Sequence, residues 1–221
     1  MDRLDFDEVL DSSHESQEET FITPQALMDN LIRIWKNELL SPVLLKPRSE
    51  FFTLVQERLE IVKRDTPTAY TRTGHLDILS FAKRLQTARV QYIVIDYHRI
   101  RLKKIEEHPL YYIGEAEECL TEEEFIFAQS LHSNLFDYLT DNILQHLPGT
   151  FPRFDESEMI TRPDCKKYVY CKALKKITIN LLENDEESPV LVPTLAFSGQ
   201  HFLIPFSQVV ELLETDQIDL A

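Results

Sequence analysis

Two cysteines and a histidine near the end of the chain are the first candidates for metal ligands. Cys165 and Cys171 are six positions apart, and His201 follows thirty positions later. Zinc sites favour cysteines separated by about two to four residues, because one turn then brings both thiolates to the same ion. The spacing therefore argues against a metal site. We expect Cys171 to lie in a strand and Cys119 in a loop.

Seven histidines and many carboxylates offer possible general bases. None of the histidines stands in a nucleophile elbow, a zinc-binding helix motif or a kinase signature. We place His132 and His146 on the partly exposed side of a helix. The glutamates at 122–124 are explained as charges in a first helical turn, and residues 183–187 as a solvated acidic loop. The residue types therefore predict no catalytic site.

The sparse glycines argue against loops that bind nucleotides. Phosphate-cradling and dinucleotide-binding turns need clustered glycines, because the backbone must approach the ligand and adopt positive φ. The four glycines instead stand alone, at positions 74, 114, 149 and 199. We therefore predict no nucleotide-dependent chemistry and no bound cofactor.

One cluster of cations could contact phosphates, since such a surface needs little more than grouped Lys and Arg side chains. It comprises Arg99, Arg101, Lys103 and Lys104. The competing interpretation is ion pairing with acidic residues of this chain or of a partner. The net charge of −15 favours pairing. A nucleic-acid-binding module that uses this basic end is the alternative function.

Cysteine use, hydropathy and the charge of the amino terminus bear on location. The three cysteines are an odd and sparse set, which fits free thiols in a reducing compartment. No apolar run approaches the roughly 18 residues of a membrane-spanning helix. The acidic start is opposite in charge to a secretory or transit signal. We predict a soluble cytosolic or nuclear protein with no membrane partner.

Helical periodicity predicts four helices joined by short connections, which together form an antiparallel bundle. The first helix begins at the Thr23–Pro24 cap, where threonine can accept a hydrogen bond and proline is preorganised, and it ends at Ser41–Pro42. The other three are expected at about 49–65, 75–108 and 121–147. A capping box at 121–124 begins the last of them.

Apolar residues recur at helical spacing in the first, second and fourth helices. In the first helix, the predicted buried face comprises Leu27, Leu31, Ile34, Trp35 and Leu39. The spacing runs through Phe52, Val55, Leu59 and Val62 in the second helix and through Phe125, Ala128, Leu131, Leu135, Leu139 and Ile143 in the fourth.

The third helix differs because it carries two apolar rows. The first row comprises Ile78, Ala82, Leu85, Ala88, Tyr92 and Ile95, and the second comprises Ile93, Tyr97 and Ile100. A helix of this extent is about 45 Å long, and the two rows together are wider than one neighbouring helix could cover. The third helix therefore indicates a subunit of a larger assembly.

The pattern changes after the fourth helix, and a small β-rich module follows. We predict strands or a short helix in six segments, at 167–171, 177–181, 189–197, 201–204, 206–213 (helical) and 217–220. The predicted fold class is α+β, with an N-terminal antiparallel helical bundle (A domain) and a small C-terminal β-rich module (B domain). The expected organisation is an acidic tail at 1–22, the A domain at 23–147, a linker at 148–165 and the B domain at 166–221.

Two sequence motifs resemble those of a known family. Trp35-Lys-Asn37-Glu38, followed by Ser41-Pro-x-Leu44-Leu45, is similar to the first-helix signature of the Sld-five subunits of the GINS complex. The long-helix signature of that family resembles a second set of residues here, namely Arg89, Tyr92, Tyr97, Arg99, Arg101, Leu102, Lys104 and Ile105. The resemblance implies structural or subunit-interface roles for these side chains.

The resemblance also implies a function. A chain of this family is a non-catalytic subunit of a heterotetramer and packs its helices against three sister subunits. With the Cdc forty-five protein and the MCM hexamer, that complex forms the replicative DNA helicase in the nucleus, and it is needed for initiation and elongation of replication. The small module would dock within the tetramer. Direct contact with DNA is left open.

The acidic amino terminus has two interpretations. A disordered tail is one of them. The other is a peptide ligand for a groove, because Asp5, Asp7, Glu8, Val9 and Leu10 resemble a motif that binds the trimeric replisome hub in fungal relatives, although Phe6 departs from it. A hydrolase or transferase with an unrecognised site is the remaining rival function.

Overall fold

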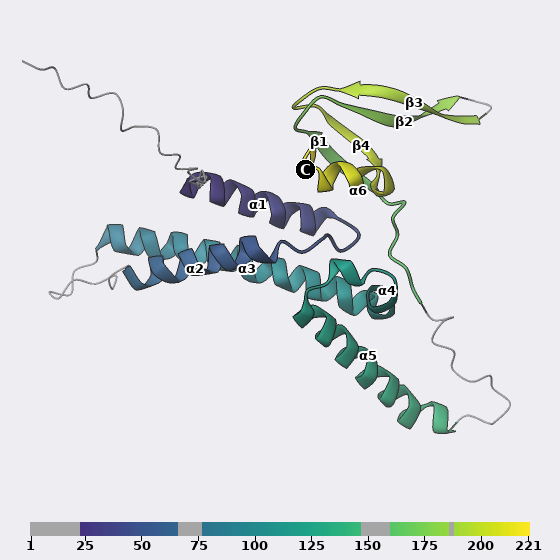
Figure 1. Ribbon diagram of the computed structural model, residues 1–221, viewed down its shortest axis with the longest axis horizontal. Coiled ribbons are helices and arrows are strands. Elements are labelled where there is room, and N and C mark those ends of the chain that lie inside the picture. The colour runs from purple at the N-terminus through teal and green to yellow at the C-terminus, as the bar shows by residue number, and fades with distance from the viewer. Residues whose placement is uncertain (1–22, 66–76, 147–159, 186–187) are drawn as a thin grey trace, which may run out of the picture.

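In a computed structural model of the protein, all but one of the described helices precede the described strands along the chain (Figure 1). The structure describes residues 23–65, 77–146, 160–185 and 188–221. The predicted tail at 1–22 and most of the predicted linker at 148–165 lie outside these ranges. Among the described residues, no helix combines the length and the hydropathy that a membrane span requires.

Three long helices run in alternating directions (Figure 1). α1 (Pro24–Leu40) and α2 (Ser49–Asp65) both pack against α3 (Ile78–Glu107). The Thr23 hydroxyl caps α1 by accepting a hydrogen bond from the Ala26 N–H group at 3.3 Å. The predicted bounds of the first two helices are therefore confirmed.

α3 begins at Ile78 rather than near His75. The reason is that the Asp77 carboxylate caps the helix, accepting a hydrogen bond from the Leu79 N–H group at 3.3 Å. The helix ends at Glu107, directly before the predicted stop at His108–Pro109. Its 30 residues contain neither glycine nor proline, which allows an uninterrupted hydrogen-bond ladder.

The region after α3 is more divided than predicted. α4 (Pro109–Gly114) and the 3₁₀ helix η1 (Glu117–Cys119) precede α5 (Glu122–Asn142), and a second 3₁₀ helix, η2 (Leu144–His146), follows it. The predicted fourth helix therefore ends earlier than about residue 147, and His146 lies in η2. The placement of Cys119 in a loop was wrong, because this residue closes η1.

Two apolar clusters stabilise the helical part. One joins α1, α2 and α3 through Leu31, Ile34, Phe52, Val55, Val94 and Tyr97, and the other joins the 41–48 connection, the end of α3, α4 and α5 through Leu44, Ile105, Tyr112, Ala116, Leu120 and Ala128. The predicted burial of Leu39 was wrong, since this residue is 47% exposed. It lies in the last turn of α1.

The C-terminal module contains a three-stranded antiparallel sheet and a hairpin. β1 (Tyr168–Ala173) is central, between β4 (His201–Pro205) and β5 (Ile218–Leu220), and α6 (Phe206–Glu214) follows β4. β2 (Ile177–Asp185) pairs with β3 (Ser188–Ala196) in a separate hairpin, which extends away from the rest of the module in Figure 1. The α+β class and all five predicted strands are confirmed. The loop predicted at 183–187 was wrong at its start, because β2 continues to Asp185.

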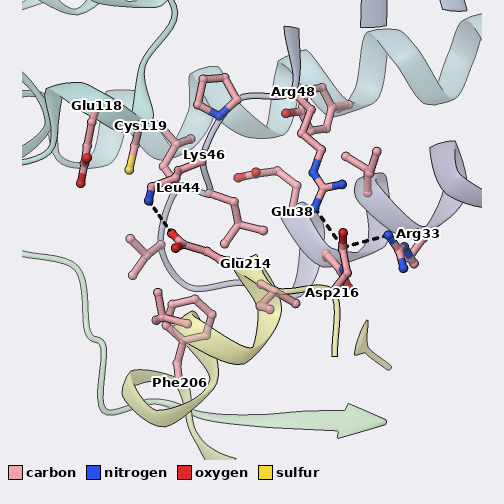
Figure 2. A pocket seen from close by; sticks show the side chains of 18 of the residues that line it. Arg33, Glu38, Leu44, Lys46, Arg48, Glu118, Cys119, Phe206, Glu214 and Asp216 are labelled. Carbon is pink, nitrogen blue, oxygen red and sulfur yellow. Dashed lines mark hydrogen bonds and ion pairs between the residues drawn. The ribbon is translucent and has the colours of Figure 1, made fainter. Parts of the chain in front are cut away.

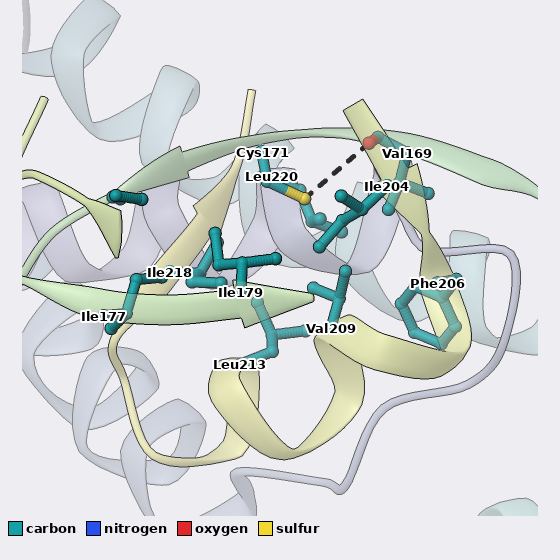
Figure 3. Packing of buried hydrophobic residues seen from close by; sticks show 12 residues of the cluster. Val169, Cys171, Ile177, Ile179, Ile204, Phe206, Val209, Leu213, Ile218 and Leu220 are labelled. Carbon is teal, nitrogen blue, oxygen red and sulfur yellow. Dashed lines mark hydrogen bonds between the residues drawn. The ribbon is translucent and has the colours of Figure 1, made fainter. Parts of the chain in front are cut away.

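The core of the module lies between the sheet and α6 (Figure 3). Val169, Cys171 and Ala173 of β1 are buried in it, against Val209 and Leu213 of α6. Burial raises the pKa of the Cys171 thiol to about 12, so this cysteine is a small apolar core residue and not a nucleophile. Its predicted place in a strand is confirmed.

Candidate functional site

A buried arginine lies at the point where four segments of the helical domain meet. Arg101 of α3 has 1% of its side chain exposed. Its guanidinium donates to both carboxylate oxygens of Glu124 in α5, with Nε–Oε1 at 2.7 Å and Nη2–Oε2 at 2.8 Å. A planar fork that meets both oxygens is the strongest geometry for such a pair. The contact therefore fixes where the first turn of α5 lies against α3.

Two further charges complete this ion-pair junction, which we define as Arg101, Glu124, Glu38 and Lys104. The Glu38 carboxylate of α1 accepts from Arg101 Nη1 at 3.3 Å and from Lys104 Nζ at 2.7 Å. Two cations and two carboxylates leave the buried group neutral overall. Such a group tolerates burial only when each charge keeps its partners.

Backbone carbonyls accept the remaining donors of the junction. Arg101 donates to the carbonyl oxygens of Leu45 and Cys119, both at 2.7 Å, and Lys104 donates to that of Val43 at 3.1 Å. These contacts extend the junction to the 41–48 connection and to η1. The junction therefore sets the positions of α1, α3, α5 and the segments between them.

Burial and the neighbouring charges shift the pKa values of the junction residues. Burial acts to raise the pKa of Glu124, but the hydrogen bond and charge of Arg101 outweigh it, so that the net pKa is lowered. Burial lowers the pKa of Lys104, and the nearby Glu38 carboxylate opposes this effect. The Arg101 guanidinium keeps its charge, since carboxylates raise its pKa despite burial.

Aromatic contacts support the junction from the side of α2. The rings of Phe52 and Tyr97 stack with centroids 4.0 Å apart, and the Arg101 guanidinium carbon lies 5.6 Å from the Tyr97 centroid. Burial raises the pKa of Tyr97 to about 12. On the adjoining part of α1, the Trp35 indole N–H donates to Asp96 of α3 at 2.9 Å. The motif tryptophan therefore fastens α1 to α3.

The C-terminal module rests on α1 through its edge strand. The Asn37 side chain accepts a hydrogen bond from the Leu220 N–H group of β5 at 2.9 Å and donates to the Asp219 carboxylate at 3.3 Å. An edge strand otherwise presents unpaired backbone groups. Asn37 therefore provides an acceptor for a backbone N–H group on the side of β5 that does not pair with β1.

Ion pairs surround a cleft of about 530 Å³ between the helical part and the module (Figure 2). Asp216, at the turn between α6 and β5, accepts from Arg33 at 2.9 Å and from Arg48 at 3.0 Å. Lys46 pairs with Glu214 at 3.0 Å. These pairs are partly exposed, so each contributes little by itself, but together they orient the module on α1 and on the 41–48 connection.

Two apolar surfaces of the helical part face solvent. The first is the outer row of α3, defined as Ile78, Ala82, Leu85, Ala88, Tyr92 and Ile95, all of which are exposed. The second lies along α5 and its end, where Ile126, Leu135, Tyr138 and Ile143 are exposed. α5 extends away from the other helices in Figure 1. Contiguous exposed apolar surface marks an interaction site in a folded protein.

The residues of the two motifs divide by exposure. Asn37, Glu38, Tyr97, Arg101 and Ile105 are buried, Trp35, Leu102 and Lys104 are partly buried, and Tyr92 and Arg99 are exposed. The ion pairs favoured for the basic cluster are present within the chain for two of its members, Arg101 and Lys104. The other two cations of the cluster, Arg99 and Lys103, are exposed. The five residues of the predicted hub-binding peptide lie outside the described residues.

Sequence reasoning missed five acidic partners. Glu124 was explained as a capping residue, and its capping box with Thr121 is present, but the same carboxylate also binds Arg101. The other four, which were not singled out, are Asp96, Glu214, Asp216 and Asp219. A carboxylate that serves two partners has no signature in a single sequence; only the capping motif could have drawn attention to Glu124.

Comparison with known proteins agrees with this geometry. A family model described as the GINS complex protein helical bundle domain matches residues 64–142. The chain is 31% identical over 213 residues to the "DNA replication complex GINS protein SLD5" of Bos taurus, covering 92% of each chain. It is 27% identical over 212 residues to the protein of the same name in Homo sapiens, again covering 92% of each chain. The chain therefore belongs to the SLD5 family of subunits of the GINS DNA replication complex.

Proposed function

We propose that this chain is a non-catalytic structural subunit of a heterotetrameric GINS complex. In this role it packs against three sister subunits and joins the MCM hexamer and the Cdc forty-five protein in the nuclear replicative helicase, for both initiation and elongation. The names of its relatives support the complex, and the exposed apolar surfaces support the mode of assembly. The side chains of the junction support a structural role, because their polar atoms are occupied within the chain.

The observation that carries the proposal is the exposed outer row of α3. The opposite side of the same helix already packs against α1 and α2 through Val94 and Tyr97. The outer row therefore has no remaining partner among the helices that the structure describes around it. Tyr92 alone is 59% exposed, and aromatic side chains of this kind anchor protein interfaces.

The junction gives this proposal a geometric basis. Because Arg101 binds Glu124 in the first turn of α5, the exposed apolar surfaces of α3 and α5 are held at one fixed angle to each other. A sister subunit would then meet a rigid two-helix surface, so that less conformational entropy is lost on binding.

We also propose the division into an A domain at 23–147, a linker at 148–165 and a B domain at 166–221, and a hub-binding role for the peptide at 5–10.

Co-expression with the three sister subunits tests the proposal. We expect a stable equimolar tetramer by size-exclusion chromatography with light scattering. Tyr92→Glu should reduce its yield strongly, because the substitution places a charge in an apolar interface. Gln91→Glu, at an exposed position beside it, adds the same charge outside the outer row and should assemble normally.

Two outcomes would contradict the assembly proposal. A monodisperse monomer that ignores the three sister subunits would overturn the proposed function. Equal loss of assembly in the two variants would show that the outer row is not the interface.

A further inference from the structure

The cations of the C-terminal module are concentrated around β1. Within residues 160–221, every Lys and Arg lies at positions 162–176. Five of them are exposed lysines, namely Lys166, Lys167, Lys172, Lys175 and Lys176. In a chain with a net charge of −15, this concentration creates a local positive surface that attracts anions.

The same strand displays tyrosines on its exposed face. Buried and exposed residues alternate along β1, because successive side chains of a strand point to opposite faces. Val169 and Cys171 point into the core beneath the sheet (Figure 3). Tyr168 and Tyr170, which are 56% and 50% exposed, therefore lie on the other face together with Lys172.

The neighbouring strand adds two residues to this face. Leu203 of β4 is opposite Tyr170, and His201 is opposite Lys172. The imidazole of His201 stacks on the Tyr170 ring, with centroids 5.5 Å apart and an angle of 4° between the planes. Tyr168, Tyr170, Lys172, His201 and Leu203 make up a surface that we name the β1–β4 face.

The positive surface continues at one end of this face. The Gly199 N–H group donates to the Ala173 carbonyl at 2.7 Å, so the turn before β4 lies beside the end of β1. At this end Lys176 Nζ lies 5.7 Å from the ring centroid of Phe197, which is 54% exposed. Lysines and exposed aromatic rings are therefore present at the end of the sheet as well as on it.

We propose that the β1–β4 face binds single-stranded nucleic acid. Exposed aromatic rings on adjacent antiparallel strands stack unpaired bases, and the surrounding lysines meet the phosphates. Tyr168 and Tyr170 are two residues apart on one strand, about 7 Å, so they offer separate platforms for different bases. A duplex keeps its bases stacked internally and leaves these rings without a partner.

An acidic peptide is the competing occupant, because it would also be attracted by the lysines. It would gain less from the flat, parallel Tyr170–His201 pair, whose shape suits a planar base. The rival nucleic-acid surface at the end of α3 is weaker, since Arg101 and Lys104 are occupied there by carboxylates. The inference concerns a different part of the chain from the outer row of α3, and it requires that the assembled complex leave the β1–β4 face open.

Fluorescence anisotropy with a labelled oligothymidylate of about 20 nucleotides tests the inference on both the full chain and the assembled tetramer. We expect binding that weakens with salt, with a log–log slope near −2 if about three lysines meet phosphates. Tyr170→Ala should weaken binding about tenfold, whereas Tyr170→Phe keeps the ring and should bind normally. Unlabelled duplex and a polyglutamate peptide serve as competitors and should displace the probe poorly.

A matched pair of double variants locates the surface. Lys172→Glu with Lys176→Glu should reduce affinity at least about tenfold. Arg99→Glu with Lys103→Glu changes the net charge by the same amount at the end of α3 and should have a much smaller effect. Thermal unfolding checks that each variant is folded.

Several results would overturn the inference. These are equal losses in the two double variants, no effect of Tyr170→Ala, and displacement by polyglutamate as effective as by the oligonucleotide. Absence of binding, or binding that is lost when the tetramer forms, would overturn it too, because we propose a face that the complex leaves open. Tetramer yield is measured separately, so a failure of the assembly role is distinguished from a failure of this inference.

Discussion

At the scale of single residues, Arg101 joins more segments of the helical part than the other members of the junction do. Its guanidinium contacts two carboxylates and two carbonyls from four different segments. A fully buried cation is costly unless every donor finds an acceptor. The position therefore requires arginine, because the single ammonium of lysine could not reach these acceptors together.

Arg101→Ala should destabilise the chain by about 3–5 kcal/mol, because it leaves the Glu124 carboxylate without its cation. Arg99→Ala, two residues earlier on the exposed side of α3, should change stability by less than about 0.5 kcal/mol. Urea unfolding followed by circular dichroism measures both. A loss below about 1 kcal/mol in Arg101→Ala would contradict the structural importance of the junction.

The lowered pKa of Glu124 gives stability a defined pH dependence. A carboxyl group with a depressed pKa in the folded state stabilises that state above its unfolded pKa, and the contribution is lost as pH falls through the folded value. Its ordinary pKa is 4.5 and the shift is downward. We therefore expect the stability difference between the natural chain and Glu124→Gln to be greatest near neutral pH. It should shrink as the pH falls below about 4.5, and a difference that stays constant would show that the carboxylate charge contributes nothing.

At the scale of elements, local signals and tertiary contacts had different predictive value. The first helix could be predicted to within a residue, because Thr23 and Pro24 act on adjacent backbone groups. Leu39 could not be placed correctly, since the exposure of a side chain depends on which distant segments pack against it. Glu124 could be recognised as a cap but not as the partner of Arg101, because the pairing needs the fold.

The capping box of α5 should be measurable by itself. Thr121→Ala removes the hydroxyl that accepts from the Glu124 N–H group, and loss of such a cap costs about 1 kcal/mol. Ser130→Ala, in the exposed middle of the same helix, replaces a weaker helix former with alanine and should be neutral or slightly stabilising. Thermal unfolding compares the two; equal effects would mean that the cap does not stabilise α5.

At the scale of the whole molecule, the arrangement separates what the chain satisfies internally from what it leaves open. Charges are paired where α1, α3 and α5 meet, and the C-terminal module is hydrogen-bonded to α1. The outer row of α3 and the exposed residues of α5 are the surfaces that we propose for contact with other subunits. The two motifs could be recognised from the sequence, whereas the seating of the module on α1 could not, since it joins residues from opposite ends of the described chain.

Asn37→Ala should loosen this seating without unfolding the helices. The Leu220 N–H group would lose its side-chain acceptor, so hydrogen exchange in the β5 segment should accelerate, while exchange in the buried part of α3 stays unchanged. Lys36→Ala, the exposed neighbour, should leave both unchanged. Faster exchange throughout the helices would instead indicate global destabilisation.

The hydrogen bond between Asn37 and Leu220 joins positions 183 apart. Contacts so distant in sequence form late, because the entropy of closing a long loop opposes them until most of the chain is already ordered. A refolding chain should therefore pass through a stage in which the helices are native-like and the backbone N–H group of Leu220 in β5 has not yet found its acceptor on α1. At that stage one molecule could pair with another, and dilute refolding conditions would favour the correct, intramolecular closure.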